Sequence, residues 1–326
     1  MKRLPHAIII LFIVFILTGC SGQSAIDTES VSEDVYSVSS GKKVLVYYIK
    51  DGFLTPVTCH IDDSEPEISS ALNLLFSGIV PTGFKNTLTN TRLNTLEISG
   101  DTVSLDISGD AFVGDKAQLA RCQILYTLTD CENITKVNIN VNGKPYATSL
   151  ERPTYINLKD PESYQEDKEE PEELCKYLTI YYPDKTTKYL IPVSIKSDII
   201  QSGEENNSKA VSVKAEDKAR AALQHLFKGA GEIGSLGTID DKMIKSLQIK
   251  DGVAVVDLDS SVIIKFSDKT QYAEIAVESV VRTLTSIDGI EKVQFLVGGV
   301  KLGYITGNIN IQNPIEPDKW YNVLTN

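Results

Sequence analysis

An internal repeat constrains the fold of this 326-residue chain more than any other sequence feature. The segment Ala71–Gly78 reads ALNLLFSG and returns 151 positions later as ALQHLFKG, at Ala222–Gly229. Further matches follow in the same order, with small insertions between them: Val46-Tyr47-Tyr48 with Ile180-Tyr181-Tyr182, Pro56-Val57 with Pro192-Val193, Leu96-Glu97-Ile98 with Leu247-Gln248-Ile249, Leu105-Asp106-Ile107 with Val256-Asp257-Leu258, Thr127-Leu128-Thr129 with Thr283-Leu284-Thr285, and Lys136-Val137 with Lys292-Val293. This ordered series predicts a tandem duplication, and hence two domains of one fold.

Each copy shows the same sequence of predicted elements. An opening strand and a short extended segment precede a helix, whose apolar residues recur at helical spacing and which ends near Gly78 or Gly229. A hairpin follows, with its turn at Gly100-Asp101 or Asp251-Gly252, and then a longer helix and a closing strand. The order β-β-α-β-β-α-β predicts α+β architecture: two tandem small sandwich domains, each with both helices on one sheet face. The other face would be free to meet a partner.

Changes in composition set the expected domain boundaries. We expect the first domain at residues 43–158, the second at 174–315 and a C-terminal tail at 316–326. Residues 159–173 contain two prolines and a dense acidic run, so they are expected to form the interdomain linker. The polar stretch Ser202–Asp217 is expected to be a surface insertion within the second domain.

The N-terminus has the pattern of a bacterial lipoprotein signal. Lys2 and Arg3 precede the apolar run Ala7–Leu17, which is too short to span a membrane comfortably. The run ends in Leu17-Thr18-Gly19-Cys20, which resembles a lipobox. We therefore expect a signal peptide over residues 1–19 and a diacylated Cys20. A Ser-rich tether over residues 20–42 would then hold the folded part at the extracytoplasmic face of the cell membrane.

The charge balance narrows the range of partners. The chain has 32 Lys and Arg against 44 Asp and Glu, a formal net charge of −12. Removal of Lys2 and Arg3 with the signal peptide would make it −14. Binding to nucleic acid requires a basic face that displaces counterions, so nucleic acid is not an expected partner. The near-neutral mean hydropathy excludes a polytopic membrane protein.

Two motifs suggest chemistry but fit simpler explanations better. Asp106 and Asp257 occupy the same place in both repeats, yet a catalytic pair has to converge on one substrate, and equivalent positions of two domains have no reason to do so. We expect solvent-facing or loop-capping roles for them. The letters of Gly229–Gly234 match a dinucleotide fingerprint, but a helix precedes them where that motif needs a strand. A helix C-cap loop is the expected structure.

No metal or cofactor site is expected from the histidines and cysteines. His60 lies near Asp62, Asp63 and Glu65 without the spacing of a known cation motif, and His225 stands where the first repeat has Leu74. Four cysteines besides Cys20 show no CxxC or Cys/His pattern: Cys59, Cys122, Cys131 and Cys175. Free, packed thiols are favoured for them, with a disulfide as the open alternative.

The paired tyrosines suggest an interaction surface. In each of the pairs Tyr47-Tyr48 and Tyr181-Tyr182, one ring points inward and the other outward, because neighbouring residues of a strand face opposite sides. Tyr48 and Tyr182 are the candidate partner contacts. A core tyrosine beside an ordinary surface tyrosine is the alternative.

Together these patterns resemble the GerM family, sporulation and germination lipoproteins of spore-forming Firmicutes. The resemblance rests on the lipobox, the tandem units, the helix ending Leu-Phe-x-Gly, the hairpin ending Leu/Val-Asp-Ile/Leu and the closing Lys-Val strand. It covers residues 43–158 and 174–315 with the N-terminal anchor. It implies domains similar to the ring-building motif of secretion-system ring proteins. It also implies a role in assembling or stabilising the channel between mother cell and forespore.

The sequence therefore favours a membrane-anchored, non-enzymatic scaffold or assembly factor in sporulation or germination. An extracytoplasmic protein complex, such as the sporulation channel, would be its partner, reached from the lipid anchor. Two other functions remain open. An envelope lipoprotein that binds a cell-wall or small-molecule ligand would have a cleft between the domains. A cell-wall hydrolase would depend on Asp106 and Asp257.

Overall fold

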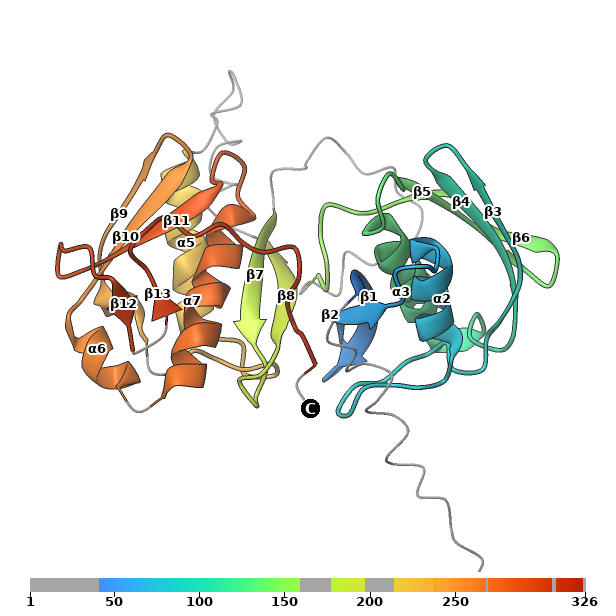
Figure 1. Ribbon diagram of the computed structural model, residues 1–326, viewed down its shortest axis with the longest axis horizontal. Coiled ribbons are helices and arrows are strands. Elements are labelled where there is room, and N and C mark those ends of the chain that lie inside the picture. Colours follow the sequence, from blue (N-terminus) through green and yellow to red (C-terminus); the bar gives the residue numbers. More distant parts are fainter. Residues whose placement is uncertain are drawn as a thin grey trace, which may run out of the picture.

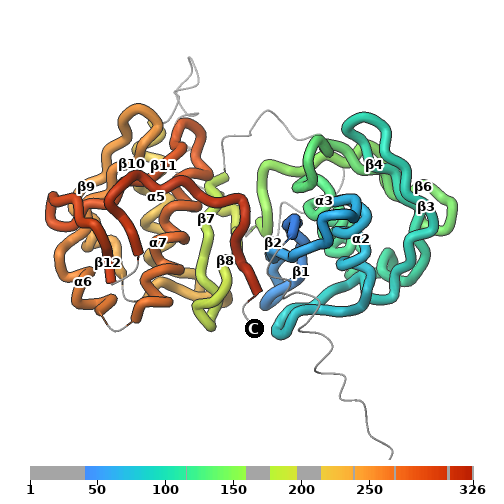
Figure 2. The backbone as a smooth tube through the Cα atoms, in the orientation of Figure 1, coloured from blue at the N-terminus to red at the C-terminus, as the bar shows by residue number. Residues whose placement is uncertain are grey.

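The computed structural model describes residues 41–158, 177–196, 214–237, 239–267, 269–306 and 309–324. They form two tandem α+β domains that lie side by side (Figure 1, Figure 2). The predicted signal peptide, Cys20, Cys175, the linker 159–173 and nearly all of the tether lie outside the described residues. In the described part of the chain, no helix is long and apolar enough to cross a membrane.

The first domain holds two sheets and two helices. Its elements are β1 (Lys42–Lys50), β2 (Phe53–Ile61), α2 (Glu67–Phe76), β3 (Arg92–Ser99), β4 (Thr102–Ser108), α3 (Ala117–Thr129), β5 (Lys136–Val141) and β6 (Lys144–Glu151). Strands β1 and β2 form an antiparallel hairpin of their own. The larger sheet has the order β3-β4-β5-β6, in which β4 and β5 are parallel and the outer pairs antiparallel.

The helices of the first domain form a layer between these two sheets (Figure 1). Ala71, Leu72 and Leu75 of α2 are completely buried, as is Ile124 of α3, and one apolar cluster joins them to both sheets. The two helices thus cover one face of the larger sheet, as the sequence predicts. The β1–β2 hairpin is a separate layer on their other side.

The second domain repeats this plan with local changes. Its elements are β7 (Tyr177–Pro183), β8 (Leu190–Lys196), α5 (Ala215–Lys228), β9 (Ile244–Lys250), β10 (Val253–Leu258), α6 (Ser261–Phe266), α7 (Thr270–Thr285), β11 (Lys292–Val297), β12 (Tyr304–Ile305) and β13 (Ile309–Asn310). The larger sheet has the order β11-β10-β9, in which β10 and β11 are parallel and β9 and β10 antiparallel. Where β6 borders β5 in the first domain, Ile315 pairs with Val293 of β11.

One predicted feature takes a different form in the structure, and one local difference separates the two domains. The expected insertion Ser202–Asp217 lies mostly outside the described residues, and its last three residues already belong to α5. The short helix α6 follows β10 in the second domain, where the first domain has only the turn of 3-10 helix Gly114–Lys116 before α3. Both segments lie between elements that the two domains share, so the layers of the fold are the same in both domains.

Candidate functional site

The two domains meet through the outer faces of their opening hairpins. Strand β2 contacts β8, and the two hairpins lie side by side at the centre of the molecule (Figure 1). Nearly every residue of β1 and β8 is buried, although residues of one strand alternate between two faces. One face of each hairpin packs on its own helices, and the other is covered at the junction. The outer face of each hairpin is therefore covered by the other domain.

Asn157 joins the hairpins on the side of the first domain. Its Oδ1 accepts a hydrogen bond from the Leu54 amide at 2.8 Å. Its Nδ2 donates to the carbonyls of Leu54 and Pro192, both at 2.7 Å. One side-chain amide thus pairs with the backbone of β2 and the backbone of β8 at once.

Asn322 makes the same bonds with the two domains exchanged. Its Oδ1 accepts from the Leu190 amide at 2.7 Å, and its Nδ2 donates to the carbonyls of Leu190 and Pro56, both at 2.8 Å. Leu190 and Pro56 are the repeat equivalents of Leu54 and Pro192. The junction therefore has an internal pseudo-twofold symmetry, and the final segment of the chain completes it. We call residues 316–324 the C-terminal strap.

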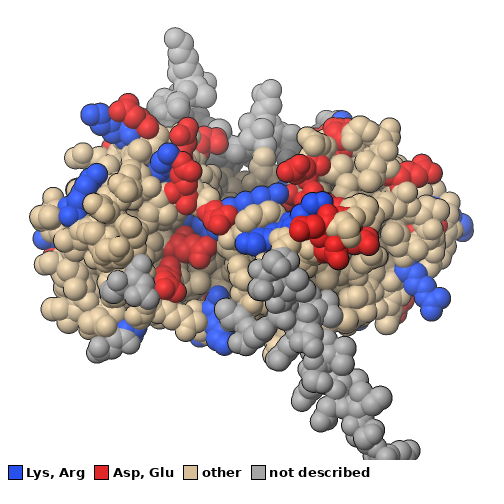
Figure 3. Space-filling model, in the orientation of Figure 1, with Lys and Arg blue, Asp and Glu red and all other residues tan. Residues whose placement is uncertain are grey.

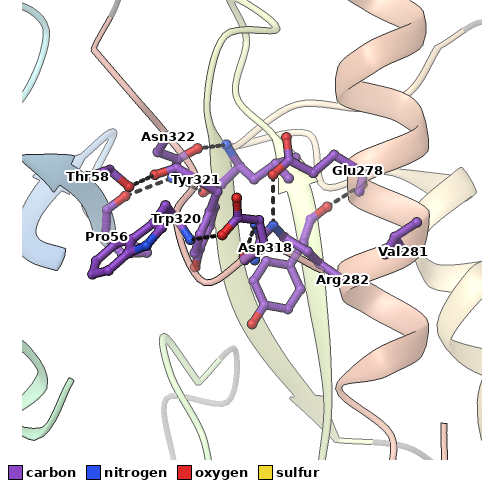
Figure 4. A network of polar contacts seen from close by, with 12 residues as sticks. Pro56, Thr58, Glu278, Val281, Arg282, Asp318, Trp320, Tyr321 and Asn322 are labelled. Carbon is purple, nitrogen blue, oxygen red and sulfur yellow. Dashed lines mark hydrogen bonds and ion pairs between the residues drawn. The ribbon is translucent and has the colours of Figure 1, made fainter. Parts of the chain in front are cut away.

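A second symmetric pair of contacts flanks the asparagines. The Ser194 amide donates to the Ile156 carbonyl at 2.8 Å, and the Ile156 amide donates back to the Ser194 hydroxyl at 2.9 Å. At the equivalent place, the Thr58 hydroxyl donates to the Tyr321 carbonyl at 2.6 Å (Figure 4). Each domain is thus bonded to the segment that follows the larger sheet of the other.

Arginines and buried tyrosines fill the junction between these bonds. Arg152 pairs with Asp130 at 2.5 Å, donates to the Tyr47 hydroxyl at 2.7 Å and lies 4.6 Å from the Tyr126 ring centroid. Burial raises the pKa of Tyr47 well above its ordinary value, which outweighs the opposing effect of the Arg152 charge. Tyr47 therefore stays neutral, and its side chain lines the junction and hydrogen-bonds there.

Arg282 makes a second arginine–tyrosine stack on the other side of the junction, although in the repeat it takes the place of Tyr126 (Figure 4). Its guanidinium lies 3.7 Å from the centroid of the Tyr321 ring and donates to the Asp318 carbonyl at 2.6 Å. It also forms an ion pair with Glu278 at 3.0 Å. These contacts hold the C-terminal strap against α7, because a guanidinium can stack on an aromatic face while its edges donate hydrogen bonds.

A buried ion pair crosses the junction at one end. Lys50 of β1 lies 3.4 Å from Asp184, and both side chains are almost completely buried. Burial by itself would raise the pKa of the Asp184 carboxyl. Hydrogen bonds from the Thr186 hydroxyl and from two backbone amides, together with the Lys50 charge, hold that pKa below its ordinary value. Asp184 is therefore ionised in the folded protein and fixes the position of Lys50.

The structure corrects the prediction for the tyrosine pairs. Tyr48 and Tyr182 are 0% and 3% exposed and belong to the cores of their own domains, so the expectation that they contact an outside partner is wrong. Tyr47 and Tyr181 are the members that face the junction. Alternation along the strand assigns the two tyrosines to opposite faces, but it does not say which face meets the helices.

Asp106 and Asp257 cap equivalent turns, as the sequence indicates. Asp106 accepts a hydrogen bond from the Gly143 amide at 2.7 Å, and Asp257 accepts one from the Gly299 amide at 2.8 Å. The bond from Gly143, with a second one from the Asn94 side chain, lowers the pKa of the Asp106 carboxyl. Each aspartate holds the turn that follows the neighbouring parallel strand.

The other sequence candidates also have structural roles. Gly229 ends α5 with a φ of 74° and donates to the carbonyls of His225 and Leu226, as expected for a helix C-cap. Near His60, Asp62 accepts hydrogen bonds from Ser64, and Asp63 accepts one from the Lys42 amide. Among the described residues, no group of three or more His, Cys, Asp or Glu could hold a metal ion.

Three of the cysteines are free thiols, as expected: Cys59, Cys122 and Cys131. Burial raises the pKa of Cys59 above its ordinary value and that of Cys131 to about 12. Both are therefore protonated at neutral pH and serve as small packing residues.

The family model described as "Germane: Sporulation and spore germination" matches residues 35–147 and 179–303. The two matches correspond to the two domains and together cover more than half of the chain. The chain belongs to the Germane family. The family resemblance seen in the sequence is thereby confirmed. No curated protein matches the sequence.

Solved structures show where this Germane fold recurs. The tandem GerMN domains of the sporulation protein GerM from Bacillus subtilis align with a TM-score of 0.57 at 21% identity, over 88% of this chain and 100% of that one. Both domains thus share the GerM fold. The first GerMN domain of the same protein aligns over 34% of this chain and 98% of its own, at 25% identity and a TM-score of 0.30. A Clostridium perfringens protein described as a candidate lipoprotein aligns over 47% of this chain and 81% of its own, at 16% identity and a TM-score of 0.23.

The residues that sequence reasoning missed are Asn157 and Asn322. Both follow an aromatic residue by one or two positions and precede an aliphatic one, in Tyr155-Ile156-Asn157-Leu158 and Trp320-Tyr321-Asn322-Val323, 165 positions apart. The repeat therefore extends through the expected C-terminal tail. Sequence pattern could have revealed this equivalence, but not the bonds that it makes.

Proposed function

We propose that this Germane protein is a membrane-anchored, extracytoplasmic, non-enzymatic scaffold in sporulation or spore germination. It would support a protein complex such as the channel between mother cell and forespore. The family description supports the process, and the fold shared with GerM supports the architecture. The lipobox ending at Cys20 supports the anchor.

The domain junction is the observation that carries this proposal. Two asparagines and a buried ion pair bond the two domains to each other, and two arginine–tyrosine stacks pack beside them, one within the first domain and one between α7 and the C-terminal strap. As a result, the larger sheets of the two domains form the opposite ends of one body (Figure 1). A body of this kind presents two surfaces at a set spacing, which suits a part that positions other proteins.

Anchoring would make weak contacts effective. A diacylated Cys20 would keep the protein at one membrane, and its partners in that membrane would then be met at high effective concentration. Contacts too weak to form a complex in solution could still be occupied there.

The test is a count of heat-resistant spores in the source organism. The gene is deleted and complemented with wild type, with Cys20→Ala, or with the double variant Asn157→Ala and Asn322→Ala. We expect the count of heat-resistant spores to fall sharply on deletion and to be restored by wild type alone. Failure of the first variant would reflect loss of the anchor, and failure of the second would reflect loss of the set domain spacing.

Two other results would argue against the proposal. Unchanged counts after deletion, with wild-type expression shown during sporulation, would exclude a required role there and favour envelope ligand binding. Full rescue by the double variant, present at wild-type level, would show that the domain spacing does not matter.

A further inference from the structure

Both domains expose large apolar side chains at the same position after the central strand of the larger sheet. In the second domain this is α6, where Ile263 is 41% and Ile264 is 77% exposed. In the first domain, 151 positions earlier, Phe112 and Val113 follow β4, and Val113 is 71% exposed. A single exposed aliphatic residue is ordinary, but the recurrence of such residues at the same place in both repeats indicates a functional surface.

The turn that follows the neighbouring parallel strand extends each of these surfaces. In the first domain the Tyr146 ring, 40% exposed, packs edge-on against Phe112 with centroids 4.7 Å apart. In the second domain the Gly298 amide donates to the Leu258 carbonyl, which places this turn next to the start of α6. Val300 and Tyr304 beyond the turn are each 58% exposed.

We name the two surfaces by their residues. The first distal patch is Phe112, Val113 and Tyr146. The second distal patch is Ile263, Ile264, Val300 and Tyr304. The second lies at the end of the molecule where Figure 1 shows α6 and β12, and there the surface in Figure 3 is largely uncharged.

The charges around the patches nearly balance. Residues 261–270 and 298–305 contain three lysines (Lys265, Lys269 and Lys301) against one carboxylate, Asp268. Residues 110–116 and 142–148 contain two lysines and two aspartates. Asp257 and Asp259 also lie beside the second patch, because they accept hydrogen bonds from the Gly299 and Ser261 amides, and Asp106 lies beside the first through its bond from the Gly143 amide. Counted with them, the second patch is neutral and the first carries one excess negative charge, in a chain of net charge −12. Lysine and tyrosine beside exposed aliphatic residues are typical of a surface that meets lipid headgroups.

The fold turns both patches toward one side. The turns of the β3–β4 and β9–β10 hairpins both lie at the top of Figure 1. The patches are at the opposite ends of β4 and β10, because each follows the last residue of its strand. The pseudo-twofold arrangement of the domains therefore lets one flat surface contact both patches together.

The chain outside the structure allows such a contact. Twenty residues lie between Cys20 and Gly41, where the described part begins, so the chain from Cys20 to Gly41 spans at most about 75 Å. A membrane that holds Cys20 therefore lies within that distance of the start of the folded part.

We propose that the two distal patches contact the surface of the lipid bilayer that carries the Cys20 anchor. Ile263, Ile264 and Val113 enter the interface between headgroups and acyl chains, and the lysines and tyrosines lie among the headgroups. This proposal rests on the lipid anchor of the proposed function.

The test uses the full lipidated protein, reconstituted in vesicles of phosphatidylcholine and phosphatidylglycerol with or without brominated acyl chains. Tryptophan is placed in each patch by Ile264→Trp and Val113→Trp. The matched control is Ile98→Trp, since Ile98 is also 53% exposed but lies beside the β3–β4 turn, at the other end of the sheet. Wild type, whose single tryptophan is Trp320, gives the background. Melting curves by circular dichroism show that all variants fold alike.

We expect brominated lipid to quench the fluorescence of both patch variants at least about twofold, with no added quenching at position 98. Equal, weak quenching at all three positions, with Cys20 shown to be acylated by mass spectrometry, would overturn the patch proposal alone. An unmodified Cys20 would overturn the anchor and with it the proposed function. A dimer of the unlipidated Cys20→Ser chain that Ile264→Glu abolishes would assign the patches to a second copy.

Discussion

Asparagine is well suited to the place that it has at the junction. Its amide both donates and accepts, so one side chain can bond an N–H and two carbonyls of different strands. Asn157 and Asn322 also have φ values of 50° and 53°, in the left-handed region that asparagine tolerates better than most residues. One residue type thus meets two local requirements, which explains why it recurs in both repeats.

Replacing Asn157 by alanine should destabilise the junction. The change leaves the Leu54 amide and two carbonyls without their partner, which we expect to cost about 2 kcal/mol of unfolding free energy. Urea unfolding followed by circular dichroism measures it. Asn140→Ala is the matched control, since Asn140 lies on the outward face of β5, remote from the junction. An equal loss in both variants would contradict the role given to Asn157.

The Asp184–Lys50 pair should make stability depend on pH. The pKa of Asp184 in the folded protein lies below its unfolded value near 3.9, so its charge stabilises the fold above that pH. The contribution is lost as the pH falls through the folded pKa. Asp184→Asn, which leaves Lys50 buried without its partner, should lower the unfolding free energy by about 3 kcal/mol at pH 7, and by progressively less as the pH is lowered below about 3.9.

Asp51→Asn provides the control for this pH dependence. Asp51 lies 3.7 Å from the same Lys50 ammonium, but its side chain is 37% exposed. Its replacement should change the unfolding free energy little over the same pH range, because exposed ion pairs contribute little. A loss at pH 7 as large as that of Asp184→Asn would show that burial of the pair is not what matters.

At the scale of elements, the C-terminal strap is the part that closes the junction. Trp320 packs on a first-domain cluster with Leu45, Tyr47 and Leu54, while Arg282 of the second domain holds Tyr321. The strap also contacts β2, where Thr58 bonds to Tyr321. It is therefore bonded to both domains, although it follows the second.

Deletion of residues 316–326 should loosen the contact between the domains without unfolding them. The deletion removes Asn322 and Tyr321 from the junction but none of the strands of the larger sheets. We expect one calorimetric transition in the whole protein and two in the truncated one, together with a larger radius of gyration in small-angle X-ray scattering. Removal of residues 325–326 alone is the control. A single transition after the longer deletion would show that the strap is dispensable.

At the scale of the whole molecule, the junction is built like the contact of a symmetric dimer within one chain. Each asparagine bonds to a leucine of its own repeat and to a proline of the other repeat. The two sets of bonds involve equivalent positions, as the two sides of a twofold interface do. A duplication of a domain that once paired with itself would give this arrangement, because the two halves then begin with matching surfaces.

The first domain alone should therefore associate with itself. In a chain of residues 41–158, the face that includes Tyr47 and Leu54 loses its cover, and Asn157 can bond Pro56 of a second copy as it bonds Pro192 here. We expect a mass near that of a dimer by light scattering after gel filtration. The Asn157→Ala variant of the same fragment should be mainly monomeric, provided that circular dichroism shows both fragments folded. A monomeric wild-type fragment would contradict the symmetric interpretation.

The sequence by itself determined the duplication, the order of the elements and the roles of Asp106, Asp257 and Gly229. These depend on local spacing: an apolar face recurs at the period of its helix or strand, and a turn needs its cap within a few residues. Only the tertiary structure decided that Tyr47 rather than Tyr48 faces the other domain, that the strap closes the junction, and that Asn157 and Asn322 join the hairpins. A strand that is apolar on both faces indicates that both faces are buried, but its sequence does not say which elements cover them. Contacts between residues more than a hundred positions apart depend on how complete domains pack, which no local pattern contains.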